Sequence, residues 1–234
     1  MSQLFLRIAF CLFIPILSWA QSNSDSSRID SSGKKVEGDA TLLTNYIWHG
    51  LTQTKLNPAI QSSIFYNFNQ TLRFGAWGSN VNYYNSNKAN SLLKLKGDIF
   101  VPLSPNTSFG IHYSDNHYFE SDDRDGNTVG LDFEAYKYNI LYEQESNWQR
   151  LGAKSKYLRV QKVWDVFGNW KWENHIGYTQ IEGAPFADYF DLLSGLGFAK
   201  GAFSWQVGFS GTSNNSQFGS SADNYIYLLL KASY

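Results

Sequence analysis

The histidines are the residues of this sequence best suited to bind a transition metal, and their spacing argues against such a site. The four histidines are His49, His112, His117 and His175. A metal-binding pair on one strand needs an even separation, because successive side chains point to opposite faces. His112 and His117 are an odd number of residues apart, so we expect neither a metal site nor a cofactor. His175, beside Lys171 and Glu173, is better interpreted as part of a polar surface.

The acidic segment 120–126 is a second candidate for cation binding. Its last four residues, 123–126, have the D-x-D-G spacing of a calcium loop. However, Ser121 stands where the first carboxylate ligand belongs, and Asp132 stands where a bidentate glutamate is expected. This pattern favours a solvated loop. The alternative is a divalent cation that bridges the loop to lipid phosphates.

Residues 208–212, Gly-Phe-Ser-Gly-Thr, resemble the nucleophile motif G-x-S-x-G. The last position of the motif is threonine instead of glycine, and the segment alternates like a strand with no strand-to-helix turn. No histidine is tied to Ser210 by the sequence. We therefore expect no catalytic residues and no enzymatic activity.

The composition excludes several classes of protein. The 234 residues carry a net charge of −1, so the sequence lacks the basic excess expected of a nucleic-acid-binding protein. After the first twenty residues, no apolar run approaches the ~18 residues of a membrane-spanning helix. Aromatic residues make up 17% of the chain beside 19 glycines. This combination is typical of many short β-strands.

The N-terminus is typical of an export signal. A positive segment ending at Arg7 precedes an apolar core, and small residues occupy Ser18 and Ala20 before the expected cleavage site. Residues 1–20 are therefore predicted to be a signal peptide, which also contains the single cysteine, Cys11. Residues 21–38 are rich in serine and charge and are predicted to be a disordered periplasmic spacer.

The remaining segment, 39–234, alternates between apolar and polar residues with period two, as half-buried strands do. About twelve strands are predicted, with ten as an alternative because the segments near 127–145 and 151–163 are less regular. The expected strands are 39–50, 58–68, 70–82, 90–102, 106–118, 127–136, 138–145, 151–163, 169–181, 187–199, 202–212 and 223–234. The connections between them are alternately short and long, and Tyr136-Lys137 should form a tight turn. This arrangement is typical of a closed antiparallel transmembrane β-barrel.

The two faces of the predicted strands differ in chemistry. Many aromatic residues lie near the strand ends of the apolar face, as in the interfacial girdles of membrane barrels. These are Trp48, Trp77, Tyr83, Tyr84, Tyr113, Tyr118, Trp164, Trp170, Trp172, Tyr189, Tyr225 and Tyr234. The opposite face carries charge in mid-strand and is predicted to line a wet lumen, where charges cost little. The predicted lining residues are Arg73, Lys94, Lys96, Asp98, Lys154, Lys156, Lys171, Glu173 and His175.

Three segments near the start of the barrel, 43–54, 57–61 and 75–81, resemble the TorF-type porin family, also called Gcw_chp, a group of uncharacterised bacterial outer-membrane proteins. The residues that carry the resemblance are Asn45, Tyr46, Gly50, Gln53, Thr54, Pro58, Gln61, Trp77, Ser79 and Asn80. His49 replaces the arginine of the family pattern and Thr52 replaces a serine. The resemblance implies an exported outer-membrane barrel. Residues 50–54 should fold inward as a hydrogen-bonded loop that narrows the mouth, or alternatively contact a solute.

These observations predict a monomeric or oligomeric barrel in the outer membrane of a diderm bacterium that passes small hydrophilic solutes. The excess of lysine and arginine in the predicted lining suggests a mild preference for anions. Expected partners are outer-membrane lipids, lipopolysaccharide and the barrel-assembly machinery, which would bind the C-terminal strand 226–234. The alternatives are a non-conducting structural or adhesive barrel that acts through its outer loops and a soluble exported β-protein.

Overall fold

The computed structural model describes residues 35–82, 90–120, 125–148 and 152–234. Their main elements are β-strands, joined by turns and by two short 3-10 helices. The strands are β1 (Val36–Leu43), β2 (Ile47–Trp48), β3 (Leu51–Thr52), β4 (Ala59–Asn67), β5 (Leu72–Val81), β6 (Asn90–Ser104), β7 (Thr107–Tyr118), β8 (Gly126–Ala135), β9 (Tyr138–Trp148), β10 (Ala153–Phe167), β11 (Trp170–Glu182), β12 (Tyr189–Lys200), β13 (Phe203–Thr212) and β14 (Tyr225–Ser233). The helices are η2 (Asn215–Gln217) and η3 (Gly219–Ser221). Neither helix has the length and apolarity to cross a membrane, and the described residues contain no other helix that does.

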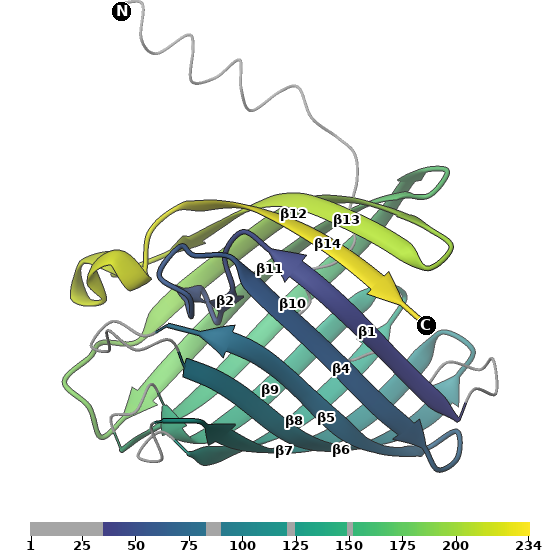
Figure 1. Ribbon diagram of the computed structural model, residues 1–234, viewed down its shortest axis with the longest axis horizontal. Coiled ribbons are helices and arrows are strands. Elements are labelled where there is room, and N and C mark those ends of the chain that lie inside the picture. The colour runs from purple at the N-terminus through teal and green to yellow at the C-terminus, as the bar shows by residue number, and fades with distance from the viewer. Residues whose placement is uncertain (1–34, 83–89, 121–124, 149–151) are drawn as a thin grey trace, which may run out of the picture.

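Twelve strands close into one antiparallel barrel, in which consecutive barrel strands pair with each other. β2 and β3 are not part of this barrel and form a separate two-stranded sheet, so β1 pairs with β4. The barrel closes where β1 lies beside β14, with Leu43 opposite Leu229 (Figure 1). Pairing with β4 on the other side of β1 leaves no open sheet edge at this point. The predicted twelve-stranded barrel is therefore confirmed, and the ten-stranded alternative is wrong.

The two rims of the barrel differ in the length of their connections. The short-turn rim holds the two chain ends of the barrel and the connections 68–71, 105–106, 136–137, 168–169 and 201–202. The long-loop rim holds the connections 44–58, 82–89, 119–125, 149–152, 183–188 and 213–224. At the short-turn rim, Tyr136 and Lys137 form the predicted tight turn with φ angles of 49° and 66°. Two consecutive positive φ angles match the twist of a type I′ hairpin turn.

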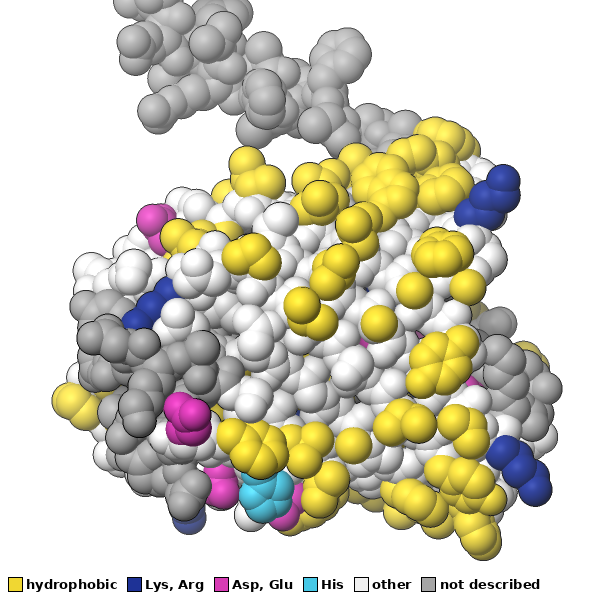
Figure 2. All heavy atoms as spheres, in the orientation of Figure 1, with side chains coloured by type: hydrophobic (Ala, Val, Ile, Leu, Met, Phe, Trp, Pro, Cys, Tyr) yellow, Lys and Arg dark blue, Asp and Glu magenta, His cyan; other side chains and the backbone are white. Residues whose placement is uncertain are grey.

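Side chains along each barrel strand alternate between the lumen and the outer surface. In β4 the odd-numbered side chains from Ala59 to Asn67 are buried, whereas Ile60 and Ile64 are exposed. Apolar side chains cover much of the outer surface, and charged side chains gather toward the two ends of the barrel (Figure 2). The lumen face instead carries most of the buried polar and charged residues that the structure describes.

The predicted aromatic girdle is partly wrong. Tyr113, Trp164, Trp170, Trp172 and Tyr234 lie on the outer surface, where Trp164 and Trp172 stack with their ring centroids 4.9 Å apart. Other members of the predicted girdle face the lumen, because they occupy the alternate positions of their strands or lie in the loop after β1. These inward residues are Trp48, Trp77, Tyr118, Tyr189 and Tyr225. Tyr83 and Tyr84 lie outside the described residues.

Two boundaries at the start of the barrel also differ from the prediction. β1 begins at Val36, so the last residues of the segment 21–38, expected to be a spacer, belong to the barrel. The signal peptide and the rest of that spacer lie outside the described residues. The segment 39–50, expected to be one strand, leaves the barrel wall after Thr44, which still bonds to Leu228 of β14, because Asn45 and the residues after it turn into the lumen.

Candidate functional site

The lumen face is acidic on balance in the part of the chain that the structure describes. Acidic side chains that face inward by strand alternation and pairing register outnumber the basic ones. The acidic residues are Glu37, Asp39, Asp98, Asp132, Glu134, Glu143, Glu145, Asp165, Glu173 and Asp191. The basic residues are Arg73, Lys94, Lys96, Arg159, Lys171 and Lys231.

Two residues predicted to line the lumen do not face it. Lys154 and Lys156 lie on the outer surface, because they alternate with the buried Ser155 and Tyr157. They occupy the end of β10 at the long-loop rim, where Lys156 forms an ion pair with Glu182. Charged side chains are tolerated there because water reaches the strand end. The other predicted lining residues occupy inward positions, namely Arg73, Lys94, Lys96, Asp98, Lys171, Glu173 and His175.

The loop after β1 forms a hairpin inside the barrel. We call residues 44–54 the lumen hairpin; β2 and β3 pair there through Ile47 with Thr52 and Trp48 with Leu51. The two turn residues, His49 and Gly50, have φ angles of 46° and 75°, the combination of positive values that a type I′ turn requires.

Hydrogen bonds between motif residues hold the base of the lumen hairpin. Asn45 Oδ1 accepts hydrogen bonds from the hydroxyls of Thr52 and Thr54, the latter at 3.2 Å. Thr54 Oγ1 in turn accepts a hydrogen bond from the backbone N–H of Tyr46 at 3.1 Å. All four side chains are almost completely buried. The predicted inward-folded, hydrogen-bonded loop is therefore confirmed.

The remaining motif residues surround this base. Asn80 ties the end of the loop to β5, because its amide donates to the carbonyl of Pro58 at 3.0 Å and accepts from the N–H of Ile60 at 2.7 Å. Trp77 packs against Tyr46 with a ring-centroid distance of 5.7 Å. Gln61 and Ser79 form an inward cross-strand pair. The backbone N–H of Gln53 donates to the carbonyl of Tyr46 at 2.6 Å. The motif thus gathers where the lumen hairpin leaves the wall.

Replacing Asn45 with alanine should loosen the lumen hairpin, because it removes the acceptor shared by Thr52 and Thr54. Leaving buried donors without a partner costs about 1–3 kcal/mol each. We expect faster cleavage within residues 44–54 when the folded barrel is treated with a nonspecific protease and the fragments are mapped by mass spectrometry. Asn69→Ala is the matched control, because Asn69 also accepts two hydrogen bonds but lies at the short-turn rim. Equal cleavage in both variants would contradict the role of Asn45.

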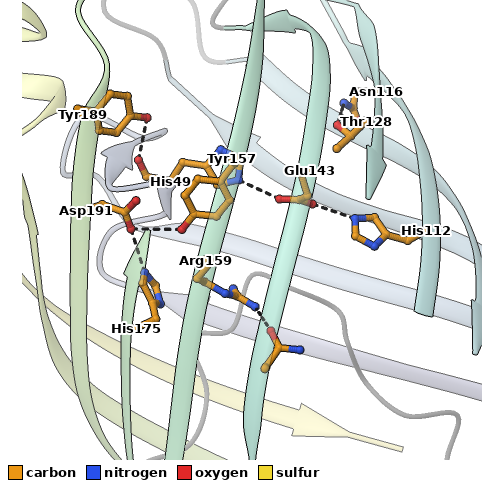
Figure 3. Close-up of polar contacts among 11 residues, drawn as sticks. His49, His112, Asn116, Thr128, Glu143, Tyr157, Arg159, His175, Tyr189 and Asp191 are labelled. Atoms are coloured by element: carbon orange, nitrogen blue, oxygen red, sulfur yellow. Dashed lines mark hydrogen bonds and ion pairs between the residues drawn. The ribbon is translucent and has the colours of Figure 1, made fainter. Parts of the chain in front are cut away.

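The tip of the lumen hairpin contacts the opposite wall. His49 Nε2 lies 3.0 Å from Glu143 Oε2 on β9, and the imidazole stacks on the Tyr157 ring of β10 at 3.7 Å. The hydroxyl of Tyr189 on β12 donates to the His49 carbonyl at 2.9 Å (Figure 3). The hydroxyl of Thr212 on β13 donates to the Gly50 carbonyl at 2.7 Å. The lumen hairpin therefore crosses the lumen from β1 to the wall made by β9–β13.

Little space is left around the tip. The cavity lined by His49, Glu143, Tyr157, Arg159 and their neighbours has a volume of about 20 Å³. This volume is close to that needed for a single water molecule. The hairpin tip therefore packs closely against this part of the wall.

A second carboxylate adjoins the tip. Asp191 Oδ1 lies 3.0 Å from His175 Nε2 and accepts a hydrogen bond from the Tyr157 hydroxyl at 3.3 Å. On the other side, Glu143 Oε1 lies 3.0 Å from His112 Nε2. Burial lowers the pKa of His49 despite its contact with Glu143.

Four lumen residues near the hairpin tip were not predicted from the sequence, namely Glu143, Tyr157, Arg159 and Asp191. A signal was present, because Asn139, Leu141 and Glu143 alternate with outward residues in β9. That segment was among the least regular in the sequence, and the partners of Glu143 come from distant strands. The contacts of these residues with the hairpin could be found only from the closed barrel.

Comparisons with known proteins agree with this architecture. The model of a family described as "Bacterial protein of unknown function (Gcw_chp)" matches residues 28–228. No curated protein matches the sequence. The fold is similar to that of the KdgM porin, with a TM-score of 0.55 and 8% identity over 85% of this chain and 98% of the porin. It is also similar to a structure described as "Unveiling the Mechanism Behind the in-meso Crystallization of Membrane Proteins", with a TM-score of 0.52 and 8% identity over 85% and 83% of the two chains.

Proposed function

The chain belongs to the Gcw_chp family of bacterial proteins, whose function is unknown, and we propose from its barrel that it is a porin-like channel of the outer membrane. It passes small hydrophilic solutes through a narrow lumen that the hairpin closes at rest. The observation that carries this proposal is the separation of the two faces, with exposed apolar side chains outside and charged side chains inside. An apolar outer belt suits hydrocarbon, whereas a charged inner wall suits a hydrated path.

The sign of the lining suggests which solutes enter more readily. The excess of inward acidic residues favours cations, because a lining of one sign concentrates ions of the opposite sign. This replaces the mild anion preference expected from the sequence. That expectation counted Lys154 and Lys156 as lining and omitted acidic residues such as Glu143 and Asp191.

A second candidate is the non-conducting barrel. The observation that favours it is the lumen hairpin itself, whose tip reaches the opposite wall and leaves a cavity of about 20 Å³. In that case the long loops would carry the function. The two candidates differ in whether the hairpin ever leaves its site.

Single-channel recording of the refolded mature protein in planar bilayers with a potassium chloride gradient tests the proposal. We expect discrete conductance steps and a reversal potential on the cation-selective side. A correctly folded barrel that stays silent, together with silent variants of the hairpin, would contradict the channel and favour the non-conducting candidate.

The charge of the lining can be tested with a matched pair of lysine substitutions. Lys171 faces the lumen, so Lys171→Glu should move the reversal potential further toward that of a cation-selective channel. Lys154→Glu makes the same change on the outer surface and should leave the reversal potential unchanged. Equal shifts in the two variants would contradict the assignment of faces.

A further inference from the structure

Two buried carboxylates beside the hairpin tip lack a permanently charged partner. Glu143 is hydrogen-bonded through both oxygens to the imidazoles of His49 and His112, each at 3.0 Å. Asp191 is bonded to His175 at 3.0 Å and to the Tyr157 hydroxyl at 3.3 Å. Their side chains are 8% and 1% exposed. Among the described residues, no lysine or arginine forms an ion pair with either one.

A buried carboxylate is costly unless a cation or a full set of hydrogen bonds compensates it. Asp191 Oδ2 is buried and has no hydrogen-bond partner among the described residues. Arg159 lines the same cavity, and its guanidinium donates to Asn139 on β9 at 2.8 Å. Lys94 approaches from β6 and lies 3.9 Å from the centre of the Trp48 ring. The two carboxylates therefore provide a site that an additional cation would stabilise.

An aromatic face adjoins both carboxylates. Tyr157 is the cross-strand neighbour of Glu143, and its hydroxyl donates to Asp191. Figure 3 shows Tyr157 between these two acidic residues, with His49 against its ring. A planar cation on the face of a tyrosine is attracted by the ring quadrupole. A group in the present place of His49 would also lie within reach of acidic side chains on two sides.

His49 makes only part of the hydrogen bonds that this site offers. Its Nε2 is bonded to Glu143, whereas its Nδ1 is buried without a hydrogen-bond partner among the described residues. A guanidinium has five N–H donors in one plane and is more weakly hydrated than an ammonium ion. It could therefore stack on Tyr157 and donate to Glu143 and Asp191 together, which a single imidazole nitrogen cannot do.

We propose that Glu143, Tyr157 and Asp191 form a binding site for solutes that carry a guanidinium group, and that His49 occupies this site in their absence. Binding of such a solute displaces the tip of the lumen hairpin and opens the lumen. The inference rests on the proposed channel function for its consequence, since displacement of the hairpin matters only if the lumen conducts. The binding step itself needs only the three wall residues.

Binding is tested first, without reference to conductance. Methylguanidinium is titrated into the folded barrel in detergent micelles while tryptophan fluorescence is recorded, with Trp48, next to His49, as the reporter. We expect a saturable change with methylguanidinium and none with methylurea, a neutral molecule of nearly the same shape. Trp48→Phe should remove most of the signal. A wild-type barrel that responds equally to both compounds, or to neither, would overturn the proposal.

Three variants locate the site. Glu143→Gln and Asp191→Asn should each weaken binding by about tenfold, the effect of losing one good charge-assisted hydrogen bond. Glu145→Gln is the matched control, because Glu145 faces the lumen from the same strand, one inward position beyond Glu143; the affinity of this variant should stay unchanged. Equal weakening in all three variants would mean that binding depends only on the net charge of the lumen, and it would contradict a specific binding site.

One further variant works even if loss of a carboxylate prevents folding. His49→Ala keeps both carboxylates and removes the competitor, so it should bind methylguanidinium more tightly than wild type. Weaker binding would mean that His49 is not the occupant of the site.

Conductance then separates the two proposals. Methylguanidinium should increase the open fraction of wild-type channels. Channels that conduct but neither bind nor respond to it would leave the proposed function standing and overturn the site. Binding to a barrel that stays silent would support the site and overturn the channel.

Discussion

Gly50→Ala should open the channel. A Cβ atom at residue 50 would lie 2.5 Å from Asp191 Cβ and 2.6 Å from Thr212 Oγ1, both on the wall that receives the hairpin tip. Such an overlap costs about 1–3 kcal/mol, which shifts the balance between the seated and released hairpin by roughly five- to 150-fold. We expect a higher open fraction and larger mean current than wild type in planar bilayers.

Gly201→Ala is the control for this substitution. Gly201 also has a positive φ angle, 61°, in a two-residue turn, so alanine produces the same kind of backbone strain. No atom lies within 4 Å of the Cβ position there, and the turn belongs to the short-turn rim. Gly201→Ala should conduct like wild type. If Gly50→Ala did so as well, the contact of the tip with Asp191 and Thr212 would not be what closes the lumen.

The second large effect is expected from Asp98→Asn, which should lower the free energy of unfolding by about 3–5 kcal/mol, the usual cost of breaking a buried ion pair. Asp98 Oδ2 accepts a hydrogen bond from Arg73 Nε at 2.7 Å, and both side chains are 1% exposed. The guanidinium also lies over the rings of Phe65 and Phe100, at 4.3 and 5.2 Å. Neutralising Asp98 leaves that charge buried in low-dielectric surroundings.

Urea unfolding of the barrel in micelles, followed by its heat-modifiable migration in gels, measures this loss. Lys154→Gln removes a charge from the exposed outer surface and should keep the wild-type midpoint. Replacing Arg73 and Asp98 together with methionine and leucine should recover much of the stability, because neither charge then has to be buried. A wild-type midpoint for Asp98→Asn would show that the pair does not stabilise the barrel.

The sequence was a good guide to the wall of the barrel because lipid-facing and lumen-facing side chains alternate in every strand. The predicted segment 169–181 differs by one residue at each end from β11, Trp170–Glu182. The Tyr136-Lys137 turn was found for a similarly local reason, since a two-residue connection between alternating segments forces a tight hairpin turn.

The same rule failed where a segment alternates without belonging to the wall. Tyr46 and Trp48 continue the alternation of β1, yet the chain turns inward there, because Asn45 bonds to Thr52 and Thr54. Alternation also does not show which face of a strand lines the lumen and which face contacts lipid. Lys154 and Lys156 were assigned to the lumen by their charge, although their place at a strand end lets them face outward.

The site at the hairpin tip depends on contacts between residues far apart in the chain. His49 meets Glu143 across 94 positions, and Gly50 meets Thr212 across 162. Neither separation leaves a local pattern in the sequence. Only closure of the barrel brings these residues together.

That separation has a consequence for biogenesis. The lumen hairpin follows the first strand of the barrel, but the residues that receive its tip lie on β9, β10, β12 and β13. Contacts of such long range form late, after the intervening chain has been ordered. The hairpin therefore cannot seat until nearly the whole wall exists, and a half-assembled barrel has a lumen without its plug. The contacts of His49 with the wall therefore form only in a completely assembled barrel. They distinguish such a barrel from an intermediate that already has most of its strands.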